Sequence, residues 1–341
     1  MLHFDSDYME GAHPEIMRRL AETNLEQTVG YGCDQYTEHA RQLVREACGA
    51  PEARVFFLVG GTQTNATVID GTLGYHQGVL AAESGHISVH EAGAVEATGH
   101  KVLTLPSHDG KVAPEEVEQY ISDFYRDETY EHMVAPGMLY ISQPTEYGTV
   151  YSLAELEQLS NTCHKHKIPL YIDGARMGYA LAAEGSDVTL KDIARLSDVF
   201  YIGGTKVGAL FGEAVVITNP DILPHFFTLV KQHGALLAKG RLLGVQFETL
   251  FSDGLYERMG GHAVGLALKL REAFRTKGYE VAMESPTNQQ FFRLPNEVMD
   301  RLKESATFEL WGPRGKTHTM VRFVTSWATR EEDVDKLISL L

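Results

Sequence analysis

The chain has 341 residues, a formal net charge of −16 and 43% hydrophobic residues. This share of hydrophobic residues excludes a disordered chain. The negative net charge argues against nucleic acid as a partner, because phosphate contacts need clustered Lys and Arg. No apolar run approaches the ~20 residues of a membrane-spanning helix, and the acidic first residues do not resemble a signal peptide. Cys33, Cys48 and Cys163 form no CxxC pair. We therefore expect a cytoplasmic protein without a disulfide framework and without a membrane partner.

Seven short apolar runs succeed one another through the first two thirds of the chain. They are rich in β-branched and aromatic residues and lie next to Gly, Pro or Asp, which predicts buried strands. The predicted strands span 55–59, 78–82, 101–106, 137–142, 168–173, 198–203 and 213–218. Helical patterns separate most of them, and such alternation is typical of a mostly parallel sheet covered by helices. The last strand follows its predecessor too closely for a helical crossover, so it is predicted to pair antiparallel.

The pattern changes after about residue 235. A helix is expected at about 260–277, followed by strands that arrive in pairs and by a closing helix. Capping-box spacing, Ser152 with Glu155 and Thr329 with Glu332, predicts where two of the helices begin. The predicted fold class is α/β, with a large domain at 11–235 and a smaller α+β domain at 236–341. Whether residues 1–10 join the smaller domain is left open.

Reactive side chains follow five of the predicted strands. Ligands of an open parallel sheet bind outside the carboxyl ends of its strands, so these side chains are expected to share a site. They include a small-residue turn before a helix, an imidazole, a polar loop, a carboxylate and an amine: Gly61 and Thr62, His86, Gln143 to Gly148, Asp173 and Lys206.

This set matches what pyridoxal 5′-phosphate (PLP) requires. A lysine holds its aldehyde, and a carboxylate keeps the pyridine nitrogen protonated so that the ring accepts electrons. Lys206 and Asp173 fit these two tasks, while Gly61 and Thr62 at a helix N-terminus suit a phosphate. Burial in a partly apolar site lowers the pKa of a lysine, which lets it act as nucleophile and base.

Each residue alone has an ordinary explanation. A lysine after a strand is usually a solvated loop residue, and an aspartate at a strand end is usually a helix cap or turn former. His86 and His90 have the spacing of metal ligands on one helix face, but no third ligand accompanies them, so we predict no metal. The order of the whole set is more specific than any member.

At these residues the chain resembles the threonine aldolase family, PLP enzymes of the β-eliminating lyase branch with the aspartate aminotransferase fold. The resemblance runs from FDSDY near residue 4 to VRFVTSW near residue 327. Its most specific segments are GGTQTN (60–65), GHISVHEAGAVEATG (85–99), DGAR (173–176) and GGTKVGA (203–209).

The resemblance implies a role for each matching residue. Lys206 is implied as the Schiff-base lysine, Asp173 as the partner of the pyridine nitrogen and His86 as the histidine stacked on the ring. Gly61 and Thr62 are implied as the phosphate contact. Four further residues are implied near cofactor or substrate: Arg176 beside the cofactor, Arg322 and Ser6 at the substrate carboxylate, and Tyr31 reaching the site across a subunit interface.

Two segments depart from the family pattern. Where many members have Thr-His-Asn-Gly, with the histidine near the substrate hydroxyl, this chain has Thr145, Glu146, Tyr147 and Gly148. Glu146 is therefore a candidate base, because a carboxylate can also take a hydroxyl proton. The family's phosphate-binding arginine segment reads GALLAKGR (234–241) here, and either Lys239 or Arg241 could substitute.

The resemblance implies cleavage of a β-hydroxy-α-amino acid, of the threonine or allo-threonine type, to glycine and an aldehyde. Glu146 or His86 would take the hydroxyl proton. A PLP-dependent β-eliminating lyase or an aminotransferase is an alternative, as is a catalytically silent PLP-fold binding protein; a nicotinamide oxidoreductase is disfavoured because GxGxxG is missing. A homodimer or homotetramer is expected, with a small amino acid as substrate.

Overall fold

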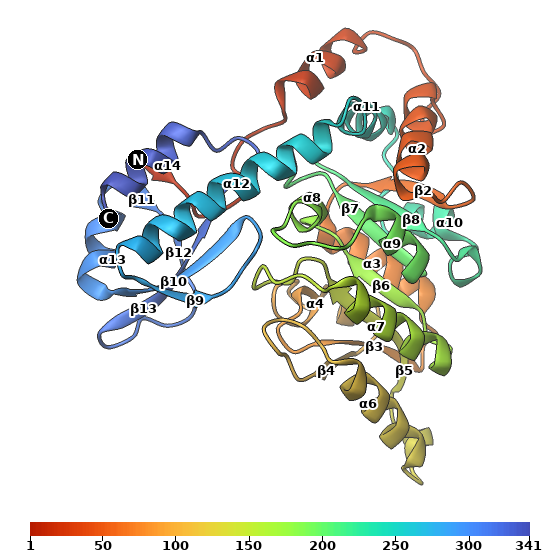
Figure 1. Ribbon diagram of the computed structural model, residues 1–341. Coiled ribbons are helices and arrows are strands. Elements are labelled where there is room, and N and C mark those ends of the chain that lie inside the picture. The colour runs from red at the N-terminus through yellow and green to blue at the C-terminus, as the bar shows by residue number, and fades with distance from the viewer.

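Successive side chains of the central strands point to opposite faces of the sheet, and apolar residues occupy both faces. The computed structural model describes all 341 residues. In β5 (Ala135–Ser142), Met138 and Tyr140 pack on one face of the sheet, and Leu139 and Ile141 pack on the other. Period-two alternation with both faces apolar requires helices on both faces. The result is a helix–sheet–helix arrangement, seen on the right of Figure 1.

The central sheet has seven strands in the order β2-β8-β7-β6-β5-β3-β4. The neighbouring pairs from β7 to β4 are parallel, whereas β8 runs antiparallel to both β7 and β2. The other strands are β2 (Arg54–Leu58), β3 (Gln77–Ala82), β4 (Val102–Leu105), β6 (Leu170–Asp173), β7 (Val199–Gly203) and β8 (Glu213–Ile217). All seven predicted strands are confirmed, as is the antiparallel pairing of the last.

Two sets of helices cover the sheet. One face packs against α3 (Gly61–Thr72), α5 (Ala94–Ala97) and α10 (Phe226–Gln232). The other face packs against α2 (Gln35–Cys48), α6 (Pro114–Arg126), α7 (Leu153–His166), α9 (Leu190–Leu196) and α11 (Arg241–Leu250). Shorter helices lie in the loops: α4 (His86–Val89), α8 (Met177–Leu181) and the 3₁₀ turns Tyr130–His132 and Pro220–Ile222. Ser152 caps α7 with a complete capping box, as predicted.

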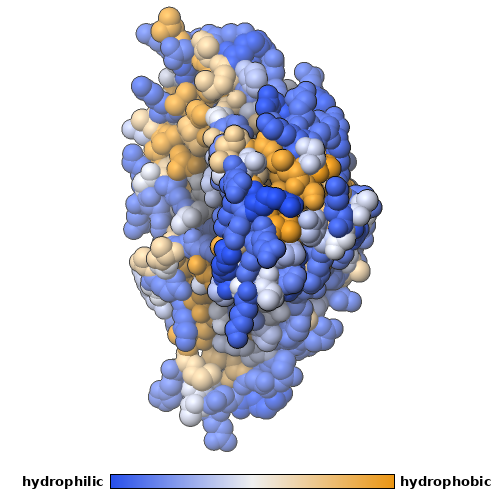
Figure 2. All heavy atoms as spheres, turned by 90° about the vertical axis from the view of Figure 1, so that its left-hand side faces the viewer, coloured by the Kyte–Doolittle hydropathy of each residue, from blue (hydrophilic) through white to orange (hydrophobic).

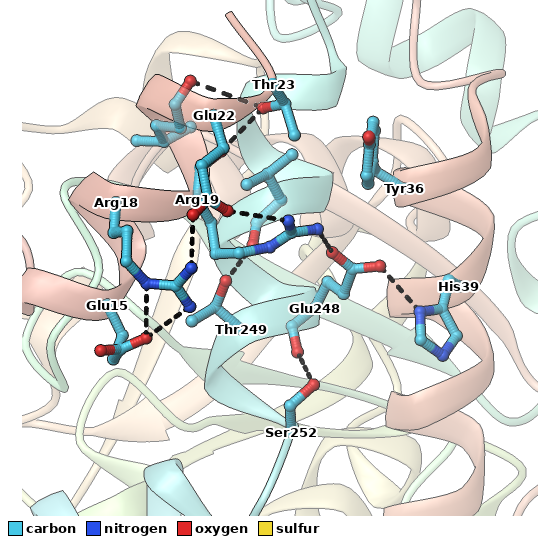
Figure 3. A network of polar contacts seen from close by, with 12 residues as sticks. Glu15, Arg18, Arg19, Glu22, Thr23, Tyr36, His39, Glu248, Thr249 and Ser252 are labelled. Atoms are coloured by element: carbon cyan, nitrogen blue, oxygen red, sulfur yellow. Dashed lines mark hydrogen bonds and ion pairs between the residues drawn. The ribbon is translucent and has the colours of Figure 1, made fainter.

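Helix α1 (Pro14–Glu22) is fastened to α11 and α2 by a polar network (Figure 3). Glu248 accepts from Arg19 of α1 at 3.2 Å and lies 2.7 Å from Nδ1 of His39 on α2. Since Glu248 is largely buried, this carboxylate joins three helices that are distant in sequence.

The helix–sheet–helix arrangement around the seven-stranded sheet is called the central layer below. The C-terminal part of the chain forms a second layer, built around an antiparallel sheet in the order β12-β13-β10-β9. The strands are β9 (Glu280–Met283), β10 (Gln289–Pro295), β12 (Glu309–Leu310) and β13 (His318–Val324). The long helix α12 (Leu255–Thr276) runs from the central layer into this one (Figure 1), where Phe274 stacks on Phe292 at 3.9 Å. Helices α13 (Asn296–Lys303) and α14 (Glu331–Ser339) complete the layer.

The start of the chain lies against this second layer. Strand β1 (Leu2–His3) pairs parallel with β11 (Ala306–Thr307), and Phe4 is fully buried in the core of the layer. Helix α11, which follows residue 235, packs with the central layer through α2. The division into domains at residue 235 stays a prediction.

One predicted helix start is wrong. Helix α14 begins at Glu331 with Arg330 as its N-cap, and no capping box forms at Thr329. The Thr329 hydroxyl instead accepts from the backbone N–H of Ser326 at 2.8 Å. The Thr329 side chain thus forms a hydrogen bond within a local turn instead of capping the helix.

The face of the molecule turned to the viewer in Figure 2 is mostly hydrophilic, with several hydrophobic areas between the hydrophilic ones. None of the helices combines the length and the apolar character that crossing a membrane requires.

Candidate active site

The carboxyl ends of the central strands border a cavity of about 270 Å³, here called the inner cavity. It is lined by seven of the residues singled out from the sequence: Gly61, Thr62, His86, Glu146, Asp173, Arg176 and Lys206. A second cavity of about 300 Å³, the adjoining cavity, shares Tyr8, His86, Glu146, Arg176 and Lys206 with it and adds Arg322. The structure therefore gathers strand ends of the central sheet and a strand of the second layer around one space.

Asp173 is the last residue of β6, and its carboxylate is held by a dense set of donors. Oδ2 accepts from Tyr140 at 2.6 Å and from Asn65 at 3.0 Å, while Oδ1 accepts from Tyr201 at 2.5 Å and from the N–H of Ala175 at 3.0 Å. Burial by itself would raise the pKa of Asp173, but nearby His86 and the donated hydrogen bonds hold that pKa below its usual value. Asp173 is thus a fixed anion in a buried site.

Asn65 links Asp173 to a second buried carboxylate. Its Nδ2 donates to Asp173 and, at 2.7 Å, to Glu91, while its Oδ1 accepts from Tyr171. Oε1 of Glu91 also lies 2.8 Å from Nδ1 of His86, which places the proton of the imidazole on Nδ1. Burial lowers the pKa of His86, but the bond to Glu91 and the charge of Asp173 raise it to a net value above the usual one. Glu91 therefore orients the His86 ring.

Lys206 lies in the loop after β7, and two glycines let this loop approach β6. A Cβ on Gly203 would lie 2.1 Å from the carbonyl oxygen of Ala175, and one on Gly174 would lie 2.1 Å from that of Tyr201. No larger residue fits at these positions, so the Asp173 turn and the Lys206 loop are packed together. Burial, with the neighbouring Arg176, lowers the pKa of Lys206. Its amine is accordingly a better nucleophile at neutral pH than a solvated lysine.

The first turn of α3 forms another wall of the inner cavity. Its N-cap is Gly60, which supplies no side-chain acceptor for the free N–H groups of the turn. Gly60 and Gly61 line the cavity without side chains, and a Cβ on Gly61 would lie 3.1 Å from the hydroxyl of Tyr201. Free amides at a helix N-terminus, with the Thr62 hydroxyl beside them, suit a phosphate group.

Glu146 is buried at the junction of the two cavities. Its Oε1 accepts from the Ser142 hydroxyl at 2.7 Å and from the backbone N–H of His86 at 2.9 Å. Its Oε2 is buried and has no partner. Burial raises the pKa of Glu146 above its usual value, so this carboxylate is a stronger base than a solvated one.

Two arginines approach from different elements. Arg176 donates to both oxygens of the buried Asp7, at 2.7 and 3.0 Å. Arg322 of β13 donates to Gln289 at 2.6 Å and to the half-exposed Glu309, and it lies 4.8 Å from the centre of the Trp311 ring. Its Nε is buried without a partner. Arg322, which lines the adjoining cavity, thus keeps one donor without a partner, while the charge of Arg176 is balanced by Asp7.

Four other predicted residues do not line either cavity. The hydroxyl of Ser6 accepts from the N–H of Tyr8, and the side chain of Tyr31 is exposed with Lys231 at 4.7 Å from its ring centre. Arg241 donates to the carbonyl groups of Thr23, Asn24 and Glu26, which occupies its guanidinium away from the site. Lys239 lines neither cavity.

Sequence reasoning missed several polar residues of the site. Asp7, Asn65, Glu91, Tyr140, Tyr201 and Glu213 all take part in it. Glu213, at the start of β8, accepts from the Thr205 hydroxyl at 2.9 Å, and burial raises its pKa to about 8. A signal was present in one case: Glu213 is an acidic residue at the start of a strand that is otherwise apolar.

The cavity chemistry fits PLP. Lys206 supplies an amine, Asp173 supplies a fixed anion, and the first turn of α3 supplies uncapped amides on the wall of the same space. Few cofactors need these three groups together.

The family comparison agrees with this site. Residues 3–298 match the model of the beta-eliminating lyase family, so the chain belongs to this family, which uses PLP. It is 30% identical to the low specificity L-threonine aldolase of Pseudomonas sp. (strain NCIMB 10558), over 98% of this chain and 95% of that protein. The low specificity L-threonine aldolase of Pseudomonas aeruginosa is also 30% identical, over 98% and 95%.

Solved structures support the fold. The Leishmania major threonine aldolase structure superposes with a TM-score of 0.97 and 41% identity, covering 100% of this chain and 98% of that chain. Aspartate aminotransferase from Thermus thermophilus, at a TM-score of 0.73 and 15% identity over 100% and 90% of the two chains, shares the fold. The predicted family, fold class and cofactor are confirmed.

Proposed function

We propose that the protein is a PLP-dependent aldolase that cleaves a β-hydroxy-α-amino acid of the threonine or allo-threonine type to glycine and an aldehyde. One observation carries this proposal: Lys206, Asp173 and Glu146, whose buried Oε2 has no hydrogen-bond partner, line the same cavity. The full-length similarity to low specificity L-threonine aldolases from two Pseudomonas strains supports it.

The cofactor supplies an electron sink for the carbon–carbon bond cleavage when it is bound. Lys206 would hold it covalently, and Asp173 would keep a proton on its ring nitrogen. Gly61 and Thr62 would bind its phosphate through the first turn of α3, and His86, oriented by Glu91, would lie against its ring. The position of Lys206, Asp173, Gly61, Thr62 and His86 on the wall of the inner cavity supports these roles.

Arg322 would bind the substrate carboxylate. A guanidinium binds a carboxylate in a planar fork, which fixes its orientation better than a point charge does. The buried Nε without a partner gives Arg322 this capacity, whereas both oxygens of Asp7 already engage Arg176. Ser6, close to Asp7 in the chain, would support the same carboxylate.

We assign the hydroxyl proton of the substrate to Glu146. Its Oε1 is engaged by Ser142 and His86, but its Oε2 is free to accept a proton. The O–H proton passes to Oε2 as the Cα–Cβ bond breaks; the aldehyde leaves, and a proton is returned to Cα to give glycine. His86 is the weaker candidate, because its raised pKa favours the protonated ring, which has no lone pair left to accept a proton.

A homodimer or homotetramer in the cytoplasm stays part of this proposal. Tyr31 and Phe227 are exposed at the outer surface, away from both cavities of their own chain. In an oligomer Tyr31 would reach the site of a neighbouring subunit. A basic residue of 231–241 would reach the phosphate of the cofactor bound in that site.

Product analysis tests the proposal. The purified protein, supplied with PLP, is incubated separately with L-threonine, L-allo-threonine and phenylserine, and glycine and aldehyde are both measured. We expect equal amounts of the two products, and no product from Lys206→Ala. A requirement for a keto acid would identify an aminotransferase, a keto acid with ammonia would identify a β-eliminating lyase, and failure to bind PLP would identify a silent binding protein.

A further inference from the structure

A wide groove continues outward from the site between the central layer and the second layer. Its volume is about 980 Å³, and we call it the outer groove. Residues of both layers line it: Glu83, Ser84, Val89, His90, Ser107, Asp109, Glu146, Tyr147, Met283, Glu309, Leu310, Trp311, Gly312 and Met320. This space is far larger than the methyl group of threonine requires.

The outer groove is continuous with the substrate position. It shares His90, Glu146, Glu309 and Trp311 with the adjoining cavity, and Glu146 also lines the inner cavity. The buried Oε2 of Glu146 has no partner at this junction. If the hydroxyl on Cβ meets Oε2, the remaining substituent on Cβ lies at the mouth of the outer groove.

Part of the wall of the outer groove is apolar and aromatic. Trp311 and Tyr147 pack edge to face at 5.9 Å, and side chains such as Val89 and Met320 add apolar surface. An aryl ring that binds in such a space buries apolar area and makes edge-to-face contacts with the aromatic side chains. The groove therefore suits a flat ring better than a short alkyl chain.

The charges of the outer groove all have one sign. Glu83 and Asp109 are exposed and take part in no ion pair, whereas Glu309 is balanced by Arg322. No Lys or Arg lines the groove, and burial with the nearby His86 holds the pKa of His90 below its usual value, so His90 is neutral near pH 8. The rim thus presents two carboxylates that form no ion pair, because the imidazole of neighbouring His108 is engaged by Glu116 at 2.8 Å.

We propose that the outer groove holds the substituent beyond Cβ and selects aryl substrates whose far end is cationic or neutral over those whose far end is anionic. This inference rests on the proposed function and concerns the charge that the same site prefers at the far end of an aryl substrate. Oppositely charged groups near a solvated rim attract modestly, and like charges repel by a similar amount.

A matched series of phenylserines tests the charge preference. The three substrates carry aminomethyl, methyl or carboxyl at the para position, so they are similar in size and differ in charge. At pH 8 and low salt we expect kcat/KM to fall in that order, by about fivefold or more from the cation to the anion. High salt should compress the difference.

Two variants locate the effect. Glu83→Gln with Asp109→Asn removes both rim charges, and Asn tolerates the positive φ of 51° at position 109. We expect the three phenylserines to come within about twofold of one another, since rim pairs account for the spread. Glu128→Gln with Glu131→Gln removes the same amount of charge from an exposed segment outside the groove and should leave the order intact.

Binding gives a readout that needs no turnover. Phenylalanines with the same para groups lack the β-hydroxyl, so they cannot undergo the cleavage. Their Kd values, measured by calorimetry on the PLP-loaded protein, should follow the same order in the wild type and lose it in the Glu83→Gln, Asp109→Asn double variant.

The outcomes separate the two proposals. Equal kcat/KM and equal Kd across the wild-type series, or an order that survives in the double variant, overturns the charge preference while cleavage of threonine still upholds the proposed function. Absence of glycine from threonine and from all three phenylserines overturns the proposed function, and the inference about the groove is then wrong with it. Threonine does not reach the rim, so its kcat/KM should be the same in the double variant.

Discussion

The carboxylate of Asp173 and the guanidinium of Arg322 bound the same site but are held in opposite ways. Four donors converge on Asp173, and each of its oxygens accepts two of them. Arg322 has a buried Nε without a partner and a half-exposed carboxylate, Glu309, on one terminal nitrogen. The cofactor side is fully organised before a ligand arrives, whereas the substrate side keeps donor capacity for a ligand that comes and leaves.

This difference predicts unequal responses to substitution. A group fixed by many neighbours acts through its charge, so a neutral replacement of the same shape removes function without disturbing the fold. A group that waits for a ligand acts through its geometry, so a replacement with the same charge is enough to weaken it.

Among substitutions that preserve the shape or the charge of the side chain, Asp173→Asn should have the largest effect. The amide keeps an acceptor at only one of the two oxygen positions, each of which accepts two hydrogen bonds, and it loses the negative charge that would stabilise a protonated ring nitrogen. We expect kcat for threonine to fall about a hundred- to a thousandfold, with a Tm lower by about a few degrees because one pair of buried donors loses its acceptor. Glycine formation and thermal unfolding followed by circular dichroism are the measurements.

Asp198→Asn is the matched control for a buried aspartate. Its carboxylate accepts from the N–H of Leu170 at 2.9 Å and from Asn219 at 2.8 Å, outside the inner cavity. We expect its turnover to match the wild type. Unchanged kcat in Asp173→Asn would show that the anion does not serve the cofactor.

Glu146→Gln should lower kcat about a hundredfold, since a positioned base contributes at least that much. The base works only when ionised, and burial raises the pKa of Glu146, so wild-type kcat should rise as pH increases through a value above that of an ordinary glutamate. This limb of the profile should vanish in Glu146→Gln. A limb that persists would assign the proton to His86 instead; Glu157→Gln, on the exposed face of α7, should keep the wild-type profile.

The sequence predicted the residues on the cofactor side of the site better than the residues that hold them in place. Asp173 and Lys206 directly follow apolar runs, and strand ends meet at one edge of a parallel sheet, so their proximity followed from topology. Asp7 and Glu91 lie in segments without a periodic pattern, and they reach Arg176 and His86 only through the tertiary fold. No local signal marks such contacts.

The buried tyrosines show a different limit. Tyr140 and Tyr201 lie inside predicted strands, where aromatic residues are typical of an apolar core. Their rings do pack in the core, but their hydroxyl groups donate to Asp173. Thr329 gives the converse case: its capping-box spacing with Glu332 is present, but its hydroxyl accepts from the backbone N–H of Ser326 instead. Spacing predicts which groups are able to meet, and packing decides which do.

Arg322→Lys should raise KM for threonine about tenfold, because the planar fork is lost while the charge remains. The change in kcat should be smaller, since the carboxylate lies away from the breaking bond. Arg293→Lys is the matched control: it lies on β10 of the same sheet, is exposed and pairs with Glu280 at 3.1 Å. An equal KM in Arg322→Lys and the wild type would mean that another group binds the carboxylate.

Glu309→Gln should have the smallest effect on KM, and it should lower KM where Arg322→Lys raises it. In the wild type the Glu309 carboxylate bonds a terminal nitrogen of Arg322, which the substrate carboxylate would also use, so binding requires this contact to loosen. A half-exposed ion pair contributes little stability, so its loss should lower KM about threefold while kcat stays constant. Steady-state kinetics with threonine measures the change, and Glu280→Gln, which frees Arg293 in the same sheet, is the control. A higher KM in Glu309→Gln would mean that Glu309 holds the guanidinium in its binding orientation, and the substrate side would then be as fully organised as the side around Asp173.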